Sequence, residues 1–518
     1  MRKTADRANE ILTRLLRTVL KTEEEALRHS PQTRGLTPGE IHALTAIGTG
    51  RAKTMTQVAA GLKISVGALT TTMNKLVKKG FVRRFRVAED RRIVKAELTE
   101  TGLAAVCAHA AFREKTAAGA FAALTGDQQE TFVRFLENIE EYYAMQAVRP
   151  VRTGPDLALL PVRIGDLEIA APIFQGDLGP AFSTPGLAAA VAAQGGVGVL
   201  SSTQPGFSEP DYERDPEGAN RRALKRNIRA ALRRRREFCT GGEPPAGSGA
   251  IAVNILCASA GYEDLVRTAV KAGAQIIISG AGVPGSLPGI VGDAGVKLVP
   301  IVSSARAVAV LRKRWAKKYN RAPDAVIFEG PGKSGHLGFK EEHLEAAADR
   351  FYQNILEIRR ELADLPNCPL IVGNGRLNRE DVKKLLAYGA DGVQIEEQFA
   401  AAEECDAPAG VRAVYRAGGA RESLLVKSPL GMPVRILRNR LAARILEGSA
   451  WSGRCIGCLD SCPKKDISFC LAETLAQTAR GDAENGILFC GKERTDAPAG
   501  DMQAAPLTVA EIFAELCG

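Results

Sequence analysis

The stretch AVIFEGPGKSGHLG, residues 325–338, is a short apolar run that ends in a glycine-rich loop. Further apolar, β-branched runs lie on both sides of it, and helical stretches separate most of them. They cover residues 169–175, 197–200, 251–256, 275–279, 297–303, 370–373 and 392–399. Eight alternations of strand and helix predict an α/β TIM (β/α)8 barrel. A doubly wound open sheet is the alternative, but no Gly-x-Gly-x-x-Gly turn follows the first run.

The division of the chain follows from its length and from one linker-like segment. A chain of 518 residues suggests two or three domains. Residues 148–157 carry two prolines and no apolar periodicity, as expected of a linker. We therefore predict an N-terminal domain over 1–147, a barrel over 158–445, and a cysteine-containing tail over 446–518 that packs on the barrel.

Composition narrows the compartment and the partners. The formal net charge of +10 is compatible with nucleic-acid binding. No apolar run reaches the ~18 residues of a membrane span, and no apolar signal segment follows the charged N-terminus. Eleven cysteines in such a chain indicate thiols or metal ligands rather than a disulfide scaffold. We expect a cytoplasmic protein that does not bind a membrane.

The residues before the linker predict an α + β winged helix-turn-helix domain. Apolar residues between 11 and 20 recur at a helical spacing and predict a first helix. Further helices are expected over 38–49, 55–61, 65–79, 99–122 and 127–146. Residues 80–86 and 93–98 read as two strands joined by a polar turn, which would form the wing.

Residues 65–79 form the predicted recognition helix, with Ser65 as its N-cap. Short polar side chains can contact base edges, and basic side chains can neutralise phosphates. The predicted contacts to double-stranded operator DNA are Ser65, Thr70, Thr71, Asn74, Lys75, Arg84, Arg91 and Arg92. Arg91 and Arg92 fall at the hairpin tip, where arginine suits a narrow minor groove. Lys78 and Lys79 are further candidates for phosphates.

Most of residues 1–146 resembles the MarR family of transcriptional regulators. The resemblance rests on GFVRR at 80–84, EDRR at 89–92 and LTETG at 98–102. MarR-type proteins are dimers that pair through their terminal helices, so the resemblance implies a homodimer built by residues 5–27 and 127–146. The alternative is that the arginines form only a solvated charged face.

Glycines gather at the ends of the predicted barrel strands. There they allow backbone N–H groups to approach a phosphate closely. In many barrels the loops after strands 7 and 8 hold a phosphate group. This end of the barrel is therefore expected to bind a phosphorylated cofactor.

Residues 158–440 resemble the nitronate monooxygenase (2-nitropropane dioxygenase) family. The motifs are Gln175-Gly176, Glu-Gly-Pro…Gly-His-x-Gly at 329–338, and Gly-Ala-Asp-Gly-Val-Gln at 389–394. The same fold and flavin site occur in FMN-dependent enoyl-acyl-carrier-protein reductases. The resemblance implies FMN as the cofactor and a small-molecule substrate.

The resemblance also implies the site residues. His336 matches the family's catalytic histidine, a base for a proton α to a nitro group, and such a base needs a pKa near neutrality. The expected cofactor-binding residues are Gln175, Gly176, Asn254, Ser303, Gly335, Gly373, Gly375 and Gln394. The alternative for His336 is a histidine that only packs a loop.

The sequence departs from the family at two places. Gly332-Lys333-Ser334-Gly335-His336 stands where Glu-Ala-Gly-Gly-His is usual, and Glu396-Glu397 stands where Gly-Thr holds the FMN phosphate. Two carboxylates beside a phosphate dianion are expected to weaken FMN binding. Lys333 would offset one charge if its side chain reaches inward.

Cys455, Cys458, Cys462 and Cys470 are close together in the tail. Their spacing is compatible with an iron–sulfur cluster or a zinc site, although it matches no standard ferredoxin or zinc-ribbon pattern. Redox-active thiols and buried structural cysteines are the alternatives.

The arginine-rich run over 221–236 predicts an amphipathic helix on the barrel wall. A solvated helix face is the simpler interpretation of this run. A contact with DNA or with an acidic partner such as acyl carrier protein is the alternative.

These features predict an FMN-dependent oxidoreductase that oxidises alkyl nitronates with O2, fused to a MarR-type DNA-binding regulator. The rival from another class is a ligand- or redox-sensing transcription factor with a non-catalytic barrel. Among enzymes, the alternative is an NAD(P)H-dependent FMN enoyl-acyl-carrier-protein reductase.

Overall fold

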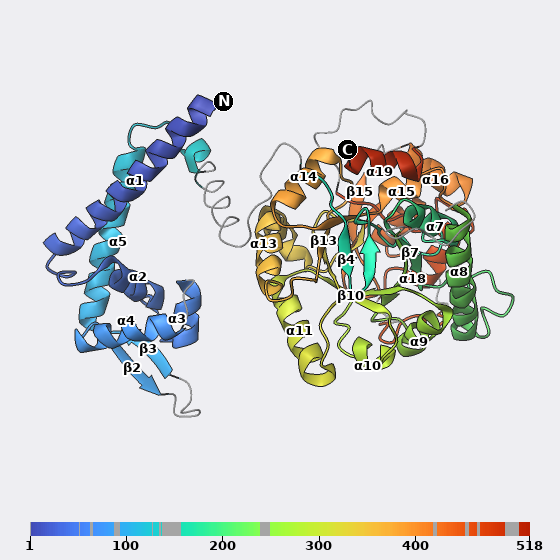
Figure 1. The fold of residues 1–518 in the computed structure, drawn as a ribbon, viewed down its shortest axis with the longest axis horizontal. Helices are drawn as coiled ribbons and strands as arrows, with labels where there is room; N and C mark the ends of the chain where they lie inside the picture. The colour runs from blue at the N-terminus through green and yellow to red at the C-terminus, as the bar shows by residue number, and fades with distance from the viewer. Residues whose placement is uncertain are drawn as a thin grey trace. The chain divides into compact units, whose positions relative to one another are not determined.

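The computed structural model describes most of the chain, which separates into two compact units, residues 1–138 and 139–518 (Figure 1). The described residues are 2–50, 52–62, 66–86, 94–126, 128–133, 136, 157–238, 249–417, 422–450, 455–463, 467–492 and 507–517. The wing tip with Arg91 and Arg92, the cap Ser65, most of the predicted helix over 127–146 and most of the predicted linker lie outside these residues.

The N-terminal unit is the predicted winged helix. Its helices are α1 (Arg2–His29), α2 (Pro38–Ile47), α3 (Met55–Gly61), α4 (Val66–Lys78) and α5 (Glu100–Phe121). Its strands β1 (Lys53–Thr54), β2 (Val82–Arg86) and β3 (Val94–Leu98) form an antiparallel sheet in the order β1-β3-β2. The short strand β1, which the sequence analysis missed, pairs with β3 through Lys53 and Thr54.

Local sequence explains where α2 begins and how the unit is held together. Thr37 and Glu40 form a capping box, and Pro38 occupies the first turn, where its missing N–H costs nothing. Apolar residues from α1, α2, α4 and the wing make one core. Leu44 and Leu69 are fully buried in it, so the recognition helix α4 is packed rigidly against α2.

The C-terminal unit contains a closed barrel of parallel strands in the order β10-β11-β13-β14-β6-β7-β8-β9. The strands are β6 (Ile173–Gln175), β7 (Val197–Ser201), β8 (Ala250–Leu256), β9 (Ile276–Gly280), β10 (Lys297–Val302), β11 (Val326–Glu329), β13 (Leu370–Gly373) and β14 (Gly392–Ile395). Each predicted run overlaps one barrel strand, which confirms the TIM barrel. Ile169 instead ends the β4–β5 hairpin (Val162–Ile164, Leu167–Ile169), and residues after Ile395 turn into α15.

Helices surround the barrel. They are α7 (Pro185–Ala193), α8 (Pro216–Phe238), α9 (Tyr262–Ala272), α10 (Leu287–Val291), α11 (Ala305–Tyr319), α12 (Leu344–Asp349), α13 (Phe351–Glu361), α14 (Arg379–Ala387), α15 (Glu397–Ala401) and α16 (Ala409–Arg416). A 3-10 turn, η1 (Glu341–His343), precedes α12. No described helix is long and apolar enough to cross a membrane.

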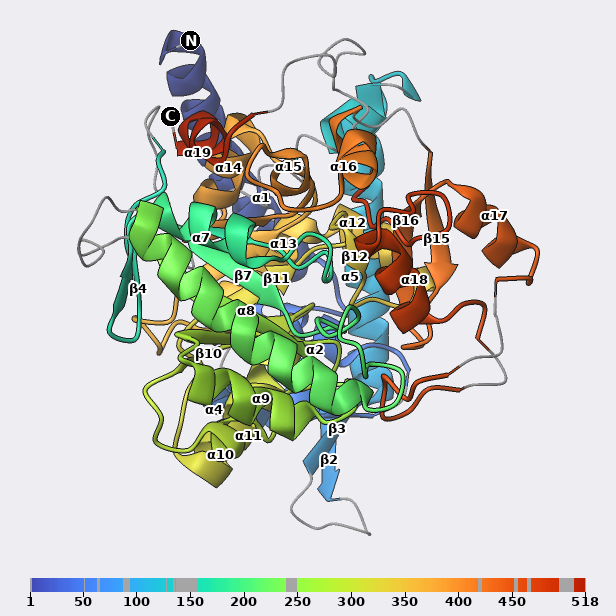
Figure 2. The ribbon, with the colours of Figure 1, turned by 90° about the vertical axis from the view of Figure 1, so that its right-hand side faces the viewer.

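Helix α8 is the predicted arginine-rich helix and lies between α7 and α9 on the barrel wall (Figure 2). Leu224 and Ile228 are fully buried, as its amphipathic pattern requires. Arg222 and Arg226 pair with Asp211 and Glu209 of the preceding loop. These ion pairs favour the simpler interpretation, a charged helix face.

A small sheet and three further helices complete the C-terminal unit. A small sheet joins β12 (Gly335–His336), β16 (Pro433–Leu437) and β15 (Ser423–Lys427). Helices α17 (Arg440–Leu446), α18 (Leu471–Ala479) and α19 (Val509–Cys517) follow. Phe469, Phe489 and Phe513 are buried in the same hydrophobic core as barrel residues, so the tail contributes to the stability of the barrel.

Candidate functional site

A cavity of about 650 Å³ opens where the barrel strands end. Of the nine barrel residues expected to bind cofactor or substrate, five line it. These are Asn254, Ser303, Gly335, His336 and Gln394. Gln175, Gly176, Gly373 and Gly375 are not among its lining residues. Loops from most of the barrel and the tail residues Leu471, Leu475 and Phe489 complete the wall.

Gln175 and Gly176 shape the end of the first barrel strand. The Gln175 side-chain oxygen accepts a hydrogen bond from the Val199 N–H at 3.1 Å, which ties β6 to β7. A Cβ atom at position 176 would lie 2.2 Å from the Glu396 side chain. A side chain at position 176 would therefore displace the Glu396 side chain from this turn.

Asp177 holds Asn254 in place at the cavity wall. Its Oδ2 accepts hydrogen bonds from Asn254 Nδ2 at 2.9 Å and from Ser201 Oγ at 3.0 Å. Asn254 Oδ1 is buried and has no hydrogen-bond partner in the described part of the chain. The sequence analysis missed Asp177, although it follows the Gln175-Gly176 motif directly.

Gln394, at the end of β14, presents a second such oxygen. Its Oε1 is buried without a hydrogen-bond partner among the described residues. Gly373 lies directly beside it, because a Cβ atom there would meet that oxygen at 2.9 Å. Both Asn254 and Gln394 thus offer an unused acceptor to whatever fills the cavity.

His336 lies in β12, which pairs with β16 opposite Val434. Its ring centroid lies 5.7 Å from that of Phe489. The Nε2 atom is buried and makes no hydrogen bond to any described residue. Burial, helped by the nearby Lys333 charge, lowers the pKa of His336 to about 3. His336 is therefore neutral at physiological pH, and its pKa lies well below the value that a base near neutrality needs.

Lys333 does reach inward. It is buried, and its Nζ pairs with Glu329 Oε1 at 2.5 Å. Glu396 is also buried, and neither of its carboxyl oxygens makes a hydrogen bond to a described residue. Burial raises the pKa of Glu396 to about 8 despite the opposing charge of Lys333. The Glu396 carboxyl is thus mostly protonated at neutral pH.

Glu397 behaves differently from its neighbour. Its Oε1 accepts hydrogen bonds from Ser334 Oγ at 2.8 Å and from the Gly491 backbone N–H. The Lys492 N–H donates to the Gly332 carbonyl at 2.9 Å, which holds this part of the tail against the loop after β11. A carboxylate from the chain itself therefore occupies donors that could otherwise meet a phosphate.

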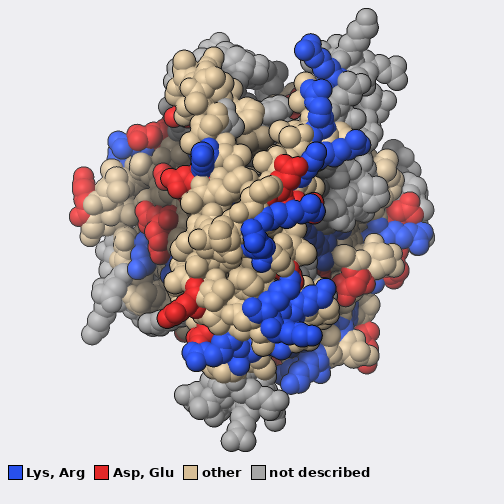
Figure 3. Space-filling model, turned by 90° about the vertical axis from the view of Figure 1, so that its left-hand side faces the viewer, with Lys and Arg blue, Asp and Glu red and all other residues tan. Residues whose placement is uncertain are grey.

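The face expected to read DNA presents α4 and β2. Thr71, Asn74 and Lys75 are exposed, and Thr70 and Arg84 are half-buried. Arg84 donates a hydrogen bond to Asn74 Oδ1 at 2.5 Å, which links the wing to the recognition helix. In Figure 3, lysine and arginine side chains run from the upper right of the face shown down to its lower part.

One predicted phosphate contact is engaged elsewhere. Lys79 pairs with Glu40 at 2.7 Å and donates to the Gly35 carbonyl at 2.7 Å. The prediction for Lys79 missed this partner, because Glu40 is distant in sequence. Lys75 and Lys78 remain exposed on α4.

The tail cysteines lie beside the loop after β8. The Ala260 N–H donates to the Cys458 carbonyl, and Leu459 forms a β-bridge with Ser259. Cys470, at the start of α18, is buried, whereas Cys455, Cys458 and Cys462 are half-buried. Burial raises the pKa of the Cys458 thiol to about 12, and the nearby Cys470 adds to the effect.

Comparisons with known proteins assign the two parts of the chain separately. The family model described as "Nitronate monooxygenase" matches residues 161–518. The chain belongs to the nitronate monooxygenase family. The "MarR family" model matches residues 36–94. The multiple antibiotic resistance protein MarR of Escherichia coli is 33% identical over 109 residues, 21% of this chain and 75% of that protein. The N-terminal unit is thus a MarR-family domain.

Other relatives are more distant. A carboxyl-CoA dehydrogenase of Mycobacterium tuberculosis, acting on an octahydroindene ring system, is 23% identical over 201 residues, 39% of this chain. The chain spans about half of that relative, 52% of its length. The solved structure of FabK from Thermotoga maritima is 22% identical with a TM-score of 0.47, and covers 67% of this chain and 91% of its own. FabT of Streptococcus pneumoniae in complex with DNA is 29% identical with a TM-score of 0.26, and covers 27% of this chain and 96% of its own.

The nitronate monooxygenase-family barrel fits one end of FMN better than the other. Asn254 Oδ1, Gln394 Oε1 and His336 Nε2 are buried polar atoms without partners in the described residues, and all belong to residues that line one cavity. Such atoms suit the polar edge of a flavin ring. At the phosphate end, Glu396 adds little charge near pH 7, but Glu397 already binds Ser334 and Gly491. The expected repulsion thus comes from one carboxylate, not two.

Proposed function

We propose that the barrel binds FMN and oxidises small alkyl nitronates with O2. The observation that carries this proposal is the set of three buried polar atoms without described partners, on Asn254, Gln394 and His336, around one cavity. Buried polar groups are normally hydrogen-bonded, so a group of unused ones favours a ligand. The cavity volume of about 650 Å³ lies within the range of small-molecule and cofactor sites.

Different side chains would bind the cofactor and meet the substrate. Asn254, oriented by Asp177, and Gln394 would hold the flavin ring, and Ser334 with the Gly491 N–H would meet its phosphate once Glu397 releases them. FMN would supply electron-pair transfer from the substrate and reaction with oxygen. Lys333 adds positive charge near the pocket, and Phe489 packs beside His336.

The state of His336 favours an anionic substrate. A nitronate carries the negative charge that remains after its α-proton has been lost, so its oxidation needs no base. A neutral imidazole can donate one hydrogen bond to that anion. A proton on His336 is held weakly, because the ring is buried beside Lys333. Neutral nitroalkanes, which must first be deprotonated, are therefore expected to react more slowly.

The direct test is to purify the full chain, reconstitute it with FMN, and measure flavin absorbance and oxygen uptake with a preformed alkyl nitronate. Flavin binding with oxygen uptake supports the proposal. Oxidation of NAD(P)H driven by an enoyl thioester, without nitronate turnover, would instead make the protein an enoyl reductase. Absence of flavin binding would favour a regulator with a non-catalytic barrel.

We also propose that the MarR-family unit binds double-stranded DNA as a homodimer. The support is an apolar stripe on α1, where Ile11, Leu15, Val19 and Leu20 are between 44% and 56% exposed in the single chain. Such a stripe is expected to be covered by a second copy. Leu15→Asp with Val19→Asp should give a monomer in analytical ultracentrifugation, whereas Val310→Asp, an exposed control on α11, should not. A dimer that survives the double change would contradict this interface.

For the tail, we propose a metal site at Cys455, Cys458, Cys462 and Cys470. The support is their sequence spacing. No three of these sulfur atoms lie within 4.8 Å of one another in the described residues, so the segment would have to close around the ion. After anaerobic purification, iron or zinc should be present near one equivalent and should fall when Cys458 becomes serine. Fully folded protein without metal at these residues would contradict the site.

A further inference from the structure

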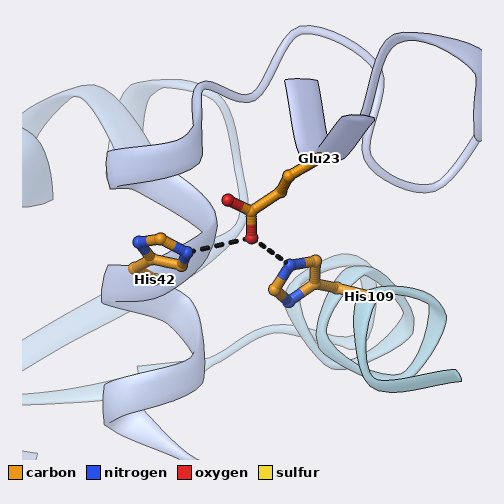
Figure 4. A group of neighbouring side chains, drawn as sticks. All are labelled: Glu23, His42 and His109. Atoms are coloured by element: carbon orange, nitrogen blue, oxygen red, sulfur yellow. Dashed lines mark hydrogen bonds and ion pairs between the residues drawn. The ribbon is translucent and has the colours of Figure 1, made fainter. Parts of the chain in front are cut away.

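Three helices of the MarR-family unit bring a carboxylate and two imidazoles together (Figure 4). Glu23 comes from α1, His42 from α2 and His109 from α5. His42 Nε2 lies 3.0 Å and His109 Nε2 lies 2.8 Å from the same atom, Glu23 Oε1. None of these residues belongs to the DNA-reading face or to the barrel cavity, and the proposed functions use none of them.

The setting of these side chains is unusual for charged and titratable groups. Glu23 is 9% exposed and His109 is 3% exposed, while His42 is half-buried. Among the described residues, this is the one group of three or more His, Cys, Asp or Glu whose ligand atoms all lie within 4.8 Å of one another. Burying a carboxylate is costly unless cations or strong donors surround it.

The arrangement of atoms suits a metal ion. Two imidazole nitrogens and one carboxylate oxygen are a common ligand set for divalent first-row transition metals. In a tetrahedral zinc site, bond lengths of about 2.0–2.2 Å place ligand atoms about 3.3 Å apart. The distances of 2.8 Å and 3.0 Å found here therefore need to grow by only a few tenths of an ångström. His42 is half-buried, which leaves access for the ion and for a water molecule as fourth ligand.

We propose that Glu23, His42 and His109 bind a divalent transition metal such as Zn²⁺ through Oε1 and the two Nε2 atoms. The ion takes the place of the protons that join the imidazoles to the carboxylate, so both histidines bind in the neutral form. Binding fastens α1 and α5 to α2. Because α1 carries the exposed apolar stripe, the ion also fixes the helix that is expected to pair with a second copy.

The same helix leads from the metal site to the recognition helix. Glu40 is two residues before His42 on α2, and its carboxylate binds Lys79, just after the end of α4. Leu44 of α2 and Leu69 of α4 are fully buried in the same core. Metal binding therefore holds α4 in one orientation, which lowers the ordering cost of DNA binding. This consequence rests on the proposed binding of DNA by the unit, whereas the metal site itself does not.

The test compares the full wild-type chain with His42→Gln, the variant of the most exposed ligand and the one that disturbs packing least. His29→Gln is the matched control, because His29 is exposed and, among the described residues, bonds to the Glu25 carbonyl alone. Circular dichroism checks that each protein is folded. After dialysis against Zn²⁺, wild type and His29→Gln should each hold one equivalent more than His42→Gln. This difference cancels any metal at the tail cysteines.

Cobalt substitution separates the two kinds of site further. Co²⁺ held by thiolates gives strong charge-transfer absorption, whereas Co²⁺ held by imidazole and carboxylate does not. The equivalent lost in His42→Gln should carry no thiolate band. Equal metal content in wild type and His42→Gln would overturn the proposal and leave the group as a hydrogen-bonded packing cluster.

The consequence for DNA is measured with a duplex selected from a random-sequence library by the wild-type protein. Zn²⁺ should tighten binding by about tenfold for wild type and for His29→Gln, but not for His42→Gln. A metal equivalent that depends on His42 without any change in DNA affinity would refute the coupling through α2. Absence of DNA binding by any of the proteins would contradict the proposed function and leave the metal measurement valid.

Discussion

Each unit of the molecule has a histidine whose Nε2 atom is buried, and the two histidines have opposite surroundings. His109 of the winged helix has a carboxylate oxygen at 2.8 Å. His336 of the barrel has no described hydrogen-bond partner for Nε2 and lies near the positive charge of Lys333. Burial alone therefore does not define the role of a histidine. The neighbouring charge decides whether it suits a cation, as His109 does, or an anion, as His336 does.

The largest expected effect tests the barrel side of this comparison. His336→Ala should lower the turnover of a preformed alkyl nitronate by ~10²–10³, because a neutral donor to the charge on the reacting atoms is lost. Turnover of neutral nitroalkane should show no larger loss, since a histidine with a pKa of about 3 contributes little as a base. His343→Ala, an exposed histidine nearby, is the control. If both substrates keep full turnover in His336→Ala, His336 is only a packing residue.

The next largest effect concerns DNA binding by the arginines of the predicted wing, which act through their charge and not through burial. Replacing Arg91 and Arg92 by alanine should weaken DNA binding by about ten- to a hundredfold. It should also lower the slope of affinity against salt by about two, because two phosphate or groove contacts are lost. Arg83→Ala is the control, since Arg83 pairs with Glu97 on the neighbouring strand. An unchanged salt slope would mean that the residues over 87–93 are not the wing that contacts DNA.

Two adjacent carboxylates give a smaller and sharper contrast. Glu397→Thr should tighten FMN binding by about tenfold, because it removes a charge and releases the Ser334 hydroxyl and the Gly491 N–H. Glu396→Gln should leave FMN affinity at pH 7 nearly unchanged, because Glu396 is already mostly neutral there. Titration of flavin fluorescence measures both. Tightening by Glu396→Gln but not by Glu397→Thr would reverse this assignment of charges.

The smallest effect is on stability. The pKa of Glu396 rises from an ordinary 4.5 to about 8 in the folded protein. The folded state thus keeps a proton that the unfolded state loses, and the stabilisation present below pH 4.5 is lost as the pH rises through 8. Glu396→Gln does not titrate, so it should raise the Tm of the barrel relative to wild type by a few degrees at pH 9, and the difference should shrink towards zero as the pH falls to 4.5.

Tryptophan fluorescence reports the thermal unfolding of the barrel alone, because Trp315 and Trp451, the two tryptophans of the chain, belong to the C-terminal unit.

His336 adds a pH dependence of the opposite sign to the stability of the barrel. Its pKa falls from 6.5 to about 3 on folding, so its contribution is lost as the pH decreases from 6.5 towards 3. Equal Tm values for wild type and Glu396→Gln at pH 9 would show that Glu396 ionises normally.

Much of the fold could be predicted because its signals are local. Each barrel strand is buried on both faces and therefore reads as a short continuous apolar run, such as 297–302. The start of α2 follows from a capping box of two residues three positions apart, Thr37 and Glu40. The ends of the first and last predicted strands were less accurate. Ile169 belongs to the β4–β5 hairpin before the barrel, and residues 396–399 form the start of α15.

The sites were harder to predict because their contacts are distant in sequence. Asp177 orients Asn254 from another strand, and Gly491 meets Glu397 from the tail. The ligand group of Glu23, His42 and His109 joins three helices. The pKa values of His336 and Glu396 depend on burial, which residue type alone does not give. The exposed residues of α4 were easier to predict as surface residues, because their exposure follows from the helical spacing of the apolar residues between them.

The contact between Phe489 and His336 has a consequence for the order in which the protein matures. The ribosome releases the winged helix, through α5, long before it reaches residue 489. At synthesis rates of about 5–20 residues per second, this interval is tens of seconds. Throughout that time the DNA-reading unit can fold while the pocket around His336 still lacks one wall. Newly made chains thus acquire the shape of a regulator before they acquire the shape of an oxidoreductase.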